Sequence, residues 1–193
     1  MTEELFREDA YLKECTARVM AVDEAGIRVD RTVFYPMGGG QPGDTGTMVR
    51  SDGSEVAIED TRKDADLDDI VHVPHPQAVR PQLGESVRLV IDWERRYRLM
   101  RMHSCMHMLC AVIPAPVTGG SISDGRGRLD FDLQDTLDRE TVTRELNAMI
   151  QRGMPMRMRW ITDAELDRQP ELVRTMSVQP PRGSGRVRLV EFE

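Results

Sequence analysis

Two histidines four residues apart form the first pattern in this sequence that is able to do chemistry. His103 and His107 bracket the run HSCMH, inside residues 93–113, whose apolar periodicity predicts a single helix. Four steps of about 100° return a side chain to nearly the same face, so the imidazoles project together about 6 Å apart along the axis. Catalytic zinc uses three protein ligands and one water, so the pair is half of a metal site or, without more ligands, an ordinary helical pair.

A glycine-rich stretch is the second such pattern. Residues 34–46 read FYPMGGGQPGDTG, in which Gly38, Gly39 and Gly40 follow one another. Successive glycines cost conformational entropy, which suits backbone that passes close to a ligand or to a neighbouring domain. A turn with a purely structural role is the alternative. The glycine spacing matches neither familiar phosphate-binding loop, which argues against a nucleotide phosphate site of those types.

The elements around these patterns predict two small domains in 193 residues. The first, residues 1–92, has short β-type runs without a helix, which predicts a small antiparallel barrel. These runs are 16–22, 27–34, 45–50, 55–61, 70–73 and 87–91. Asp92 is placed to cap the helix that follows, and the apolar positions on the histidine face predict that the pair points into the interior.

The second domain, residues 93–193, is predicted to be a two-layer α+β domain. After the histidine helix come an extended stretch at 118–123, an alternating strand at 128–133 and a helix at 139–152. The inward positions of that helix are Val142, Leu146, Met149 and Ile150. A strand follows through Met156, Met158 and Trp160, and then a short helix begun by the capping box Thr162-x-x-Glu165. The last strand covers residues 186–192.

Composition narrows the class of protein. No apolar run reaches 18 residues and the N-terminus is acidic, so we expect neither a membrane span nor a signal peptide. Three cysteines, Cys15, Cys105 and Cys110, lack CxxC spacing and favour a reducing compartment, hence the cytoplasm. The net charge of −7 is uneven, because residues 1–92 carry 10 Lys and Arg against 19 Asp and Glu, and the remainder 16 against 14.

Four arginines crowd the start of the histidine helix: Arg95, Arg96, Arg98 and Arg101. They are able to contact the phosphates of a nucleic acid, although solvated helix faces explain such arginines equally well.

Four motifs in one order resemble a known family. FYPMGGGQPGDTG, RMHSCMHML, TGGSIS and RLDFDL together resemble the alanyl-tRNA editing proteins, relatives of the editing domain of alanyl-tRNA synthetase. The resemblance covers nearly the whole chain. It implies a β-barrel domain followed by an α+β editing domain. It also implies a zinc-dependent esterase that removes mischarged serine from alanine tRNA, with no DNA or membrane partner.

The resemblance also assigns roles to residues. It implies that His103 and His107 are zinc ligands, and that the Gly38-Gly39-Gly40-Gln41 loop approaches the metal cleft. Thr118 is expected beside the bound aminoacyl group, with Gln41 as the second catalytic candidate. The substrate-binding expectation covers Gly38, Gly39, Gly40, Ser121 and Arg128, and the nucleic-acid-binding expectation covers Arg95, Arg96, Arg98 and Arg101.

One departure keeps alternatives open. The family's second ligand pair is a Cys-x-x-x-His segment after a strand like 186–192, and the given sequence ends at Glu193. Cys110 lies about 10.5 Å along the axis from His103, too far to join both histidines on one ion. Either the sequence is cut before that pair, which we favour, or this member has lost its metal and is a non-catalytic tRNA-binding module. A metallopeptidase is disfavoured, because position 104 is Ser where HExxH has Glu.

Overall fold

The computed structural model describes residues 2–64, 69–173 and 185–192. They form two compact units. The first contains the described residues up to Arg101 together with Ile122–Arg126, and the second contains Met102–Ser121 with the described residues from Gly127 onward. Within these ranges no helix is both long enough and apolar enough to cross a membrane.

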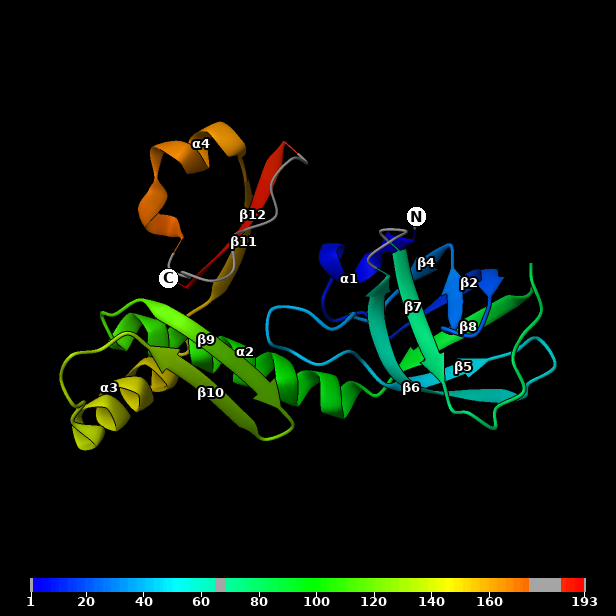
Figure 1. Cartoon of the computed structure of the whole chain (residues 1–193), viewed down its shortest axis with the longest axis horizontal. Coiled ribbons are helices and arrows are strands. Elements are labelled where there is room, and N and C mark those ends of the chain that lie inside the picture. Colours follow the sequence, from blue (N-terminus) through cyan, green and yellow to red (C-terminus); the bar gives the residue numbers. More distant parts are fainter. Residues whose placement is uncertain (1, 65–68, 174–184, 193) are drawn as a thin grey trace. The chain divides into compact units, whose positions relative to one another are not determined.

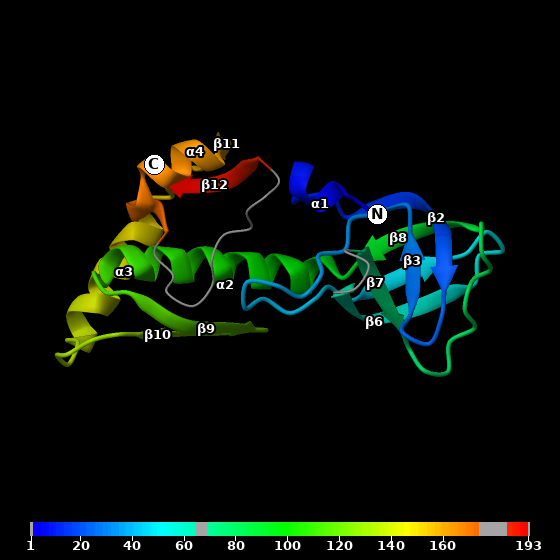
Figure 2. The same ribbon diagram turned by 45° about the horizontal axis from the view of Figure 1, so that its top comes forward.

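The first unit is a closed barrel of six antiparallel strands, joined in the order β2-β3-β7-β6-β5-β8 (Figure 1; β3 is labelled in Figure 2). The strands are β2 (Glu14–Val22), β3 (Ile27–Val29), β5 (Gly46–Val49), β6 (Glu55–Asp64), β7 (Asp69–Pro74) and β8 (Ser86–Ile91). Alternation along β8 directs Val87, Leu89 and Ile91 inward, where all are buried. Closure gives every strand two neighbours, which confirms the predicted small barrel.

The predicted strand 27–34 is wrong as a single element. It divides into β3 and β4 (Arg31–Thr32), and β4 pairs in parallel with β1 (Glu3–Glu4) outside the barrel. Asp30 marks the break, because its carboxylate accepts from the Arg18 N–H at 2.7 Å and its carbonyl accepts from the Glu3 N–H at 2.8 Å. The short helix α1 (Leu5–Glu8), which buries Phe6, was not predicted either.

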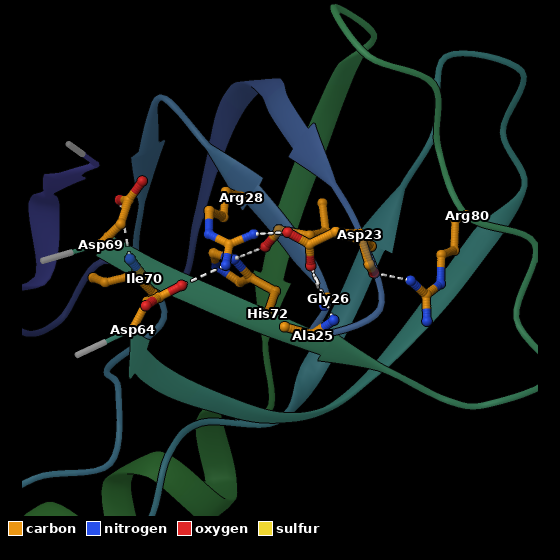
Figure 3. Close-up of polar contacts among 10 residues, drawn as sticks. Asp23, Ala25, Gly26, Arg28, Asp64, Asp69, Ile70, His72 and Arg80 are labelled. Carbon is orange, nitrogen blue, oxygen red and sulfur yellow. Dashed lines mark hydrogen bonds and ion pairs between the residues drawn. The ribbon is translucent and has the colours of Figure 1, made fainter. Parts of the chain in front are cut away.

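Polar groups are buried among the barrel strands (Figure 3). Arg28 is 5% exposed and donates to Asp23 and Asp64, each at 2.5 Å. His72 is 0% exposed; its Nδ1–H donates to the Ile27 carbonyl at 3.1 Å, and its Nε2 accepts from the Thr32 hydroxyl at 2.8 Å. Burial lowers the pKa of His72 to about 4, so the imidazole is neutral and both ring nitrogens are satisfied.

The second unit contains two separate two-stranded antiparallel sheets and several helices. One sheet joins β9 (Val117–Ser123) to β10 (Arg126–Phe131), a hairpin whose tip is grouped with the first unit. The other joins β11 (Met156–Thr162) to β12 (Arg186–Phe192). The helices are α3 (Arg139–Gln151), α4 (Asp163–Arg168) and the 3₁₀ turn η1 (Pro170–Leu172). The helix α2 (Trp93–Val112) begins in the first unit and ends in the second.

Local signals place these helices as the sequence predicts. Asp138 caps α3 by accepting from the Glu140 and Thr141 N–H groups, and Thr162 and Glu165 form the predicted capping box of α4. The prediction that one face of α3 is directed inward is wrong in the extent of burial. No residue of that helix is buried, and Ile150 is 47% exposed. The buried apolar cluster here consists of Ile161, Leu166 and Val187.

Candidate active site

Helix α2 carries the histidine pair, and its first turn is fixed by Asp92. The Asp92 carboxylate accepts from the Arg95 N–H at 3.1 Å, and its carbonyl accepts from the Arg96 N–H at 3.0 Å. These bonds satisfy donors that a helix start otherwise leaves unpaired, so the predicted N-cap is confirmed. The helix ends at Val112, close before Pro114, which is unable to continue it.

The two imidazoles stack on one another. The ring centroids of His103 and His107 are 5.0 Å apart and the ring planes differ by 9°. Parallel rings one helical turn apart follow from the four-residue spacing, so the prediction that the two side chains share a face is confirmed. The prediction that the pair points into the protein interior is wrong, because His103 is half-buried and His107 is exposed. The pair therefore lies where a ligand from solvent is able to reach it.

Both rings are neutral at pH 7. Desolvation, with a smaller effect of the neighbouring His107, lowers the pKa of His103 from 6.5 to about 4. Desolvation also lowers the pKa of His107, whose ring meets His103 on one side while the residue as a whole remains exposed. Neutral imidazole is the form that offers a nitrogen lone pair to a metal or to a proton.

A complete metal site is not present among the described residues. No group of three or more His, Cys, Asp or Glu side chains within those ranges is placed to hold a metal ion. The three cysteines have no disulfide partner, and burial raises the pKa of the Cys105 thiol, which opposes its ionisation. The histidines therefore fit as two ligands of a zinc ion, and a catalytic zinc requires at least one more.

The hairpin β9–β10 packs along the histidine-bearing half of α2, as Figure 2 shows. Glycines allow this approach, because a Cβ on Gly127 would lie 2.8 Å from the Met106 sulfur and 2.9 Å from the Met102 sulfur. A Cβ on Gly120 would lie 3.5 Å from the Met106 Cε. Two methionines and two glycines therefore hold the hairpin against the Met102 and Met106 side of α2, which lies about 100° round the helix axis from the His103 and His107 side.

Thr118, Ser121 and Arg128 all lie on this hairpin and all are exposed. The Thr118 hydroxyl donates to the Asp130 carbonyl at 3.2 Å, and the Arg128 Nε donates to the Asp130 carboxylate at 2.8 Å. Their assigned roles toward a substrate stay predictions.

The glycine loop forms a tight turn. The N–H groups of Gly38 and Gln41 each donate to the other's carbonyl at 3.0 Å, and Gly39 and Gly40 adopt positive φ angles of 57° and 77°. Such angles suit glycine, so these two glycines are explained by the turn itself. Gln41 is 4% exposed, and the Gly40 carbonyl accepts from the Ile122 N–H at 2.8 Å. The approach of this loop to the histidine pair stays a prediction.

Three of the four arginines expected to contact phosphate have partners within the first unit. Arg95 donates to the Gly43 carbonyl at 2.8 Å, and Arg98 donates to both carboxylate oxygens of Asp124 at 2.6 and 2.7 Å. Arg96, instead of facing solvent, is 3% exposed and forms a buried ion pair with Asp44. The three side chains therefore tie the start of α2 to the segment after the glycine loop and to the hairpin tip.

Sequence reasoning did not identify Asp44 or Asp124 as the partners. Burial raises the pKa of the Asp44 carboxyl against the opposing effect of Arg96. One Asp44 oxygen accepts from the Tyr35 N–H at 2.8 Å as well as from Arg96, and the other has no hydrogen-bond partner among the described residues. The sequence signal for Asp44 was an acidic residue within the glycine-rich stretch 34–46.

Comparison with known proteins finds relatives that are similar to this chain over nearly all of its residues. A family model described as tRNA synthetases class II (A) matches residues 6–95. An alanyl-tRNA editing protein AlaX-M of Saccharolobus solfataricus is 31% identical over 94% of this chain and 78% of its own length. Proteins of the same name are 35% identical in Methanosarcina acetivorans, over 100% of this chain and 83% of theirs, and 34% in Pyrococcus horikoshii, over 95% and 84%.

Proposed function

Because the chain belongs to the alanyl-tRNA editing proteins, we propose that it hydrolyses the ester bond of alanine tRNA mischarged with serine. The observation that carries the proposal is the stacked, neutral pair His103 and His107 on a solvent-accessible face of α2. The similarity, which covers at least 94% of this chain in each of the three relatives, supports the substrate class. The family name specifies neither the mischarged amino acid nor a metal, so we propose both serine and zinc.

The need for such an enzyme follows from the limits of a binding pocket. A hydrophobic pocket built for alanine rejects an isostere with one added hydroxyl only about 100-fold, so a second site that recognises the hydroxyl is required for accuracy. The chemistry is the hydrolysis of an ester joining the amino acid to the terminal ribose. Binding the serine hydroxyl then decides which ester is cleaved.

His103 and His107 would hold the zinc ion through one ring nitrogen each, and the described residues place no third His, Cys, Asp or Glu ligand beside them. When bound, zinc supplies an acidified water and polarises a carbonyl oxygen. The histidines contribute lone pairs that need no deprotonation at pH 7, since desolvation already keeps both rings neutral. Met102 and Met106 pack under the hairpin next to this helix face.

Thr118 is proposed to select the serine. Its hydroxyl lies on the exposed hairpin, 3.2 Å from the Asp130 carbonyl, and would exchange a hydrogen bond with the serine hydroxyl. Thr118→Val should lower the serine-to-alanine ratio of deacylation rates by about 5- to 150-fold, whereas Thr118→Ser should preserve it. An unchanged ratio in the Val variant would leave selectivity to other groups, with Gln41 the next to test.

The experiment that tests the proposal uses the native protein with seryl-tRNA and alanyl-tRNA. We expect zinc to copurify, and His103→Ala to lose zinc and at least 100-fold of the seryl-tRNA deacylation rate while tRNA affinity changes little. The matched control is His75→Ala, which removes a half-exposed imidazole of the barrel unit. Full deacylation after the zinc has been removed, or equal loss of tRNA affinity and rate in His103→Ala, would contradict the proposal.

A non-catalytic tRNA-binding module is the second candidate. It is favoured by the lack of a third metal ligand among the described residues. Native protein that binds alanine tRNA tightly, contains no zinc and leaves seryl-tRNA intact would establish this alternative.

A further inference from the structure

An exposed group of aromatic rings and cations lies on the first unit, at the start of α2. We call it the aromatic platform and define it by Tyr11, Lys13, Trp93, Tyr97 and Arg101. Tyr11 is 58% exposed and Tyr97 is 40% exposed. By contrast, Phe34 of the same unit is buried completely, with an exposed fraction of 0%. Rings left at the surface in a chain with only 5% aromatic residues therefore need an explanation.

The rings are arranged as a continuous surface. Trp93 and Tyr97 are one helical turn apart and stack, with centroids 5.5 Å apart and planes at 24°. The Tyr11 ring lies 5.6 Å from Trp93 and 6.5 Å from Tyr97, tilted against both. The N-terminal segment is held there by a backbone bond, since the Ile91 N–H donates to the Lys13 carbonyl at 3.0 Å.

Each stacked ring also carries a cation. The Lys13 ammonium lies 5.0 Å from the Trp93 centroid, and the Arg101 guanidinium lies 6.0 Å from the Tyr97 centroid. Neither cation forms an ion pair with any described residue. Arg96 and Arg98 on the same helix do form ion pairs, so the two platform cations differ from their neighbours in retaining charge for an external partner.

We propose that the aromatic platform binds unpaired nucleotides of an RNA, with bases stacking on Tyr11 and Tyr97 and phosphates facing Lys13 and Arg101. Aromatic faces beside unpaired cations are the combination that single-stranded nucleic acids select, because every base offers a π-face and every linkage a negative charge. A purely apolar partner would leave both cations buried without counter-charges, which is costly. The inference rests on the proposed function, since it names where the tRNA substrate is held away from the reacting ester.

The test is a binding titration of the native protein with a fluorescein-labelled 12-nucleotide single-stranded RNA and with a blunt RNA duplex of the same sequence. We expect tighter binding of the single strand. Tyr97→Ala should weaken it about 5- to 150-fold, while Tyr97→Phe, which keeps the ring, should bind like the wild type. Tyr11→Ala serves the same purpose if Tyr97→Ala fails to fold.

The two lysines of the chain supply a matched charge control. Lys13→Ala should weaken binding several-fold and reduce the slope of log affinity against log salt by about 0.7, because one phosphate contact is lost. Lys63→Ala removes the same charge from an exposed position on β6 and should change neither quantity. Equal losses in the two variants would show diffuse electrostatics and overturn the inference.

The remaining outcomes separate this inference from the proposed function. Unchanged RNA affinity in both tyrosine-to-alanine variants overturns the platform, even if seryl-tRNA deacylation is normal. Loss of concentration-dependent self-association in Tyr97→Ala, with RNA binding unchanged, would identify the surface as a contact between copies. Failure of the proposed function would instead appear as no deacylation by a wild-type protein that still binds the single strand through these residues.

Discussion

The barrel and the second unit differ in how much apolar surface each buries for itself. Twelve buried apolar residues of the barrel form one cluster, whereas the corresponding cluster of the second unit has three among the described residues. Several large apolar side chains of the second unit are exposed: Leu133, Leu137, Ile150, Met156, Met158, Trp160, Leu172 and Val190. The barrel unit therefore buries a larger apolar cluster than the described part of the second unit does.

Topology explains the difference. The barrel closes on itself, so the inward positions of all six strands face one interior. The second unit has two-stranded sheets, and an isolated pair of strands is unable to enclose a core. The histidine pair belongs to this less buried unit, which agrees with the general tendency of sites to occupy the less stable parts of a fold.

The largest effect is expected from the buried ion pair of the barrel unit. Asp44→Ala leaves the Arg96 guanidinium, 3% exposed, without its counter-charge and should lower the free energy of unfolding by about 3–5 kcal/mol. Urea denaturation measures the change. Glu14→Ala is the control, because it breaks the exposed pair with Arg88 and should cost less than about 1 kcal/mol. Similar small losses of unfolding free energy in both variants would mean that the Arg96 guanidinium becomes hydrated once Asp44 is removed.

Two leucines compare the cores directly. Leu89→Ala removes a side chain that is 0% exposed in the large cluster and should cost about 3–4 kcal/mol, because its rigid surroundings retain a cavity. Leu166→Ala, at 2% exposed, should cost about 2 kcal/mol, since the three-residue cluster collapses more readily. Denaturation of each variant measures the loss of unfolding free energy. Equal losses would show that the surroundings of Leu166 are as rigid as those of Leu89.

Acid should weaken the barrel through His72. The folded state holds the pKa of this imidazole at about 4, below the ordinary 6.5, because protonation would charge a fully buried ring. Below pH 6.5 the unfolded chain therefore binds a proton that the folded chain refuses, so stability falls as the pH falls. The loss reaches about 3 kcal/mol by pH 4.

Urea denaturation between pH 7 and pH 4 tests this contribution. His72→Gln should flatten the pH dependence, whereas His75→Gln, which replaces a half-exposed imidazole of the barrel, should retain the wild-type slope. An unchanged slope in His72→Gln would assign the acid sensitivity to carboxylates.

The smallest effect is expected on the exposed sheet face of the second unit. Met158→Thr should change the free energy of unfolding by less than about 0.5 kcal/mol, because this side chain is 45% exposed. Met20→Thr, at 54% exposed on β2, is the matched substitution in the barrel unit and should be equally mild. A cost of several kcal/mol at Met158 alone would show that this face is covered in solution and would break the comparison.

Sequence alone determined the elements whose signals are local. Short β-type runs located the six barrel strands, although the run 27–34 was too long, and the caps Asp92, Asp138 and Thr162 located three helix starts. The four-residue spacing determined that His103 and His107 stack on one face, because helical geometry fixes that relation within a single turn. The family itself followed from four short motifs.

Only the tertiary structure decided which distant groups meet. Arg96 has the same local pattern as Arg95 and Arg98, yet only Arg96 is buried, because Asp44 lies against it across 52 residues of sequence. The break of the run 27–34 at Asp30 depends on Glu3 and Arg18, and the platform depends on Lys13 being held at Ile91. Periodicity acts between near neighbours in the chain, whereas burial and charge pairing depend on chain segments that only folding brings together.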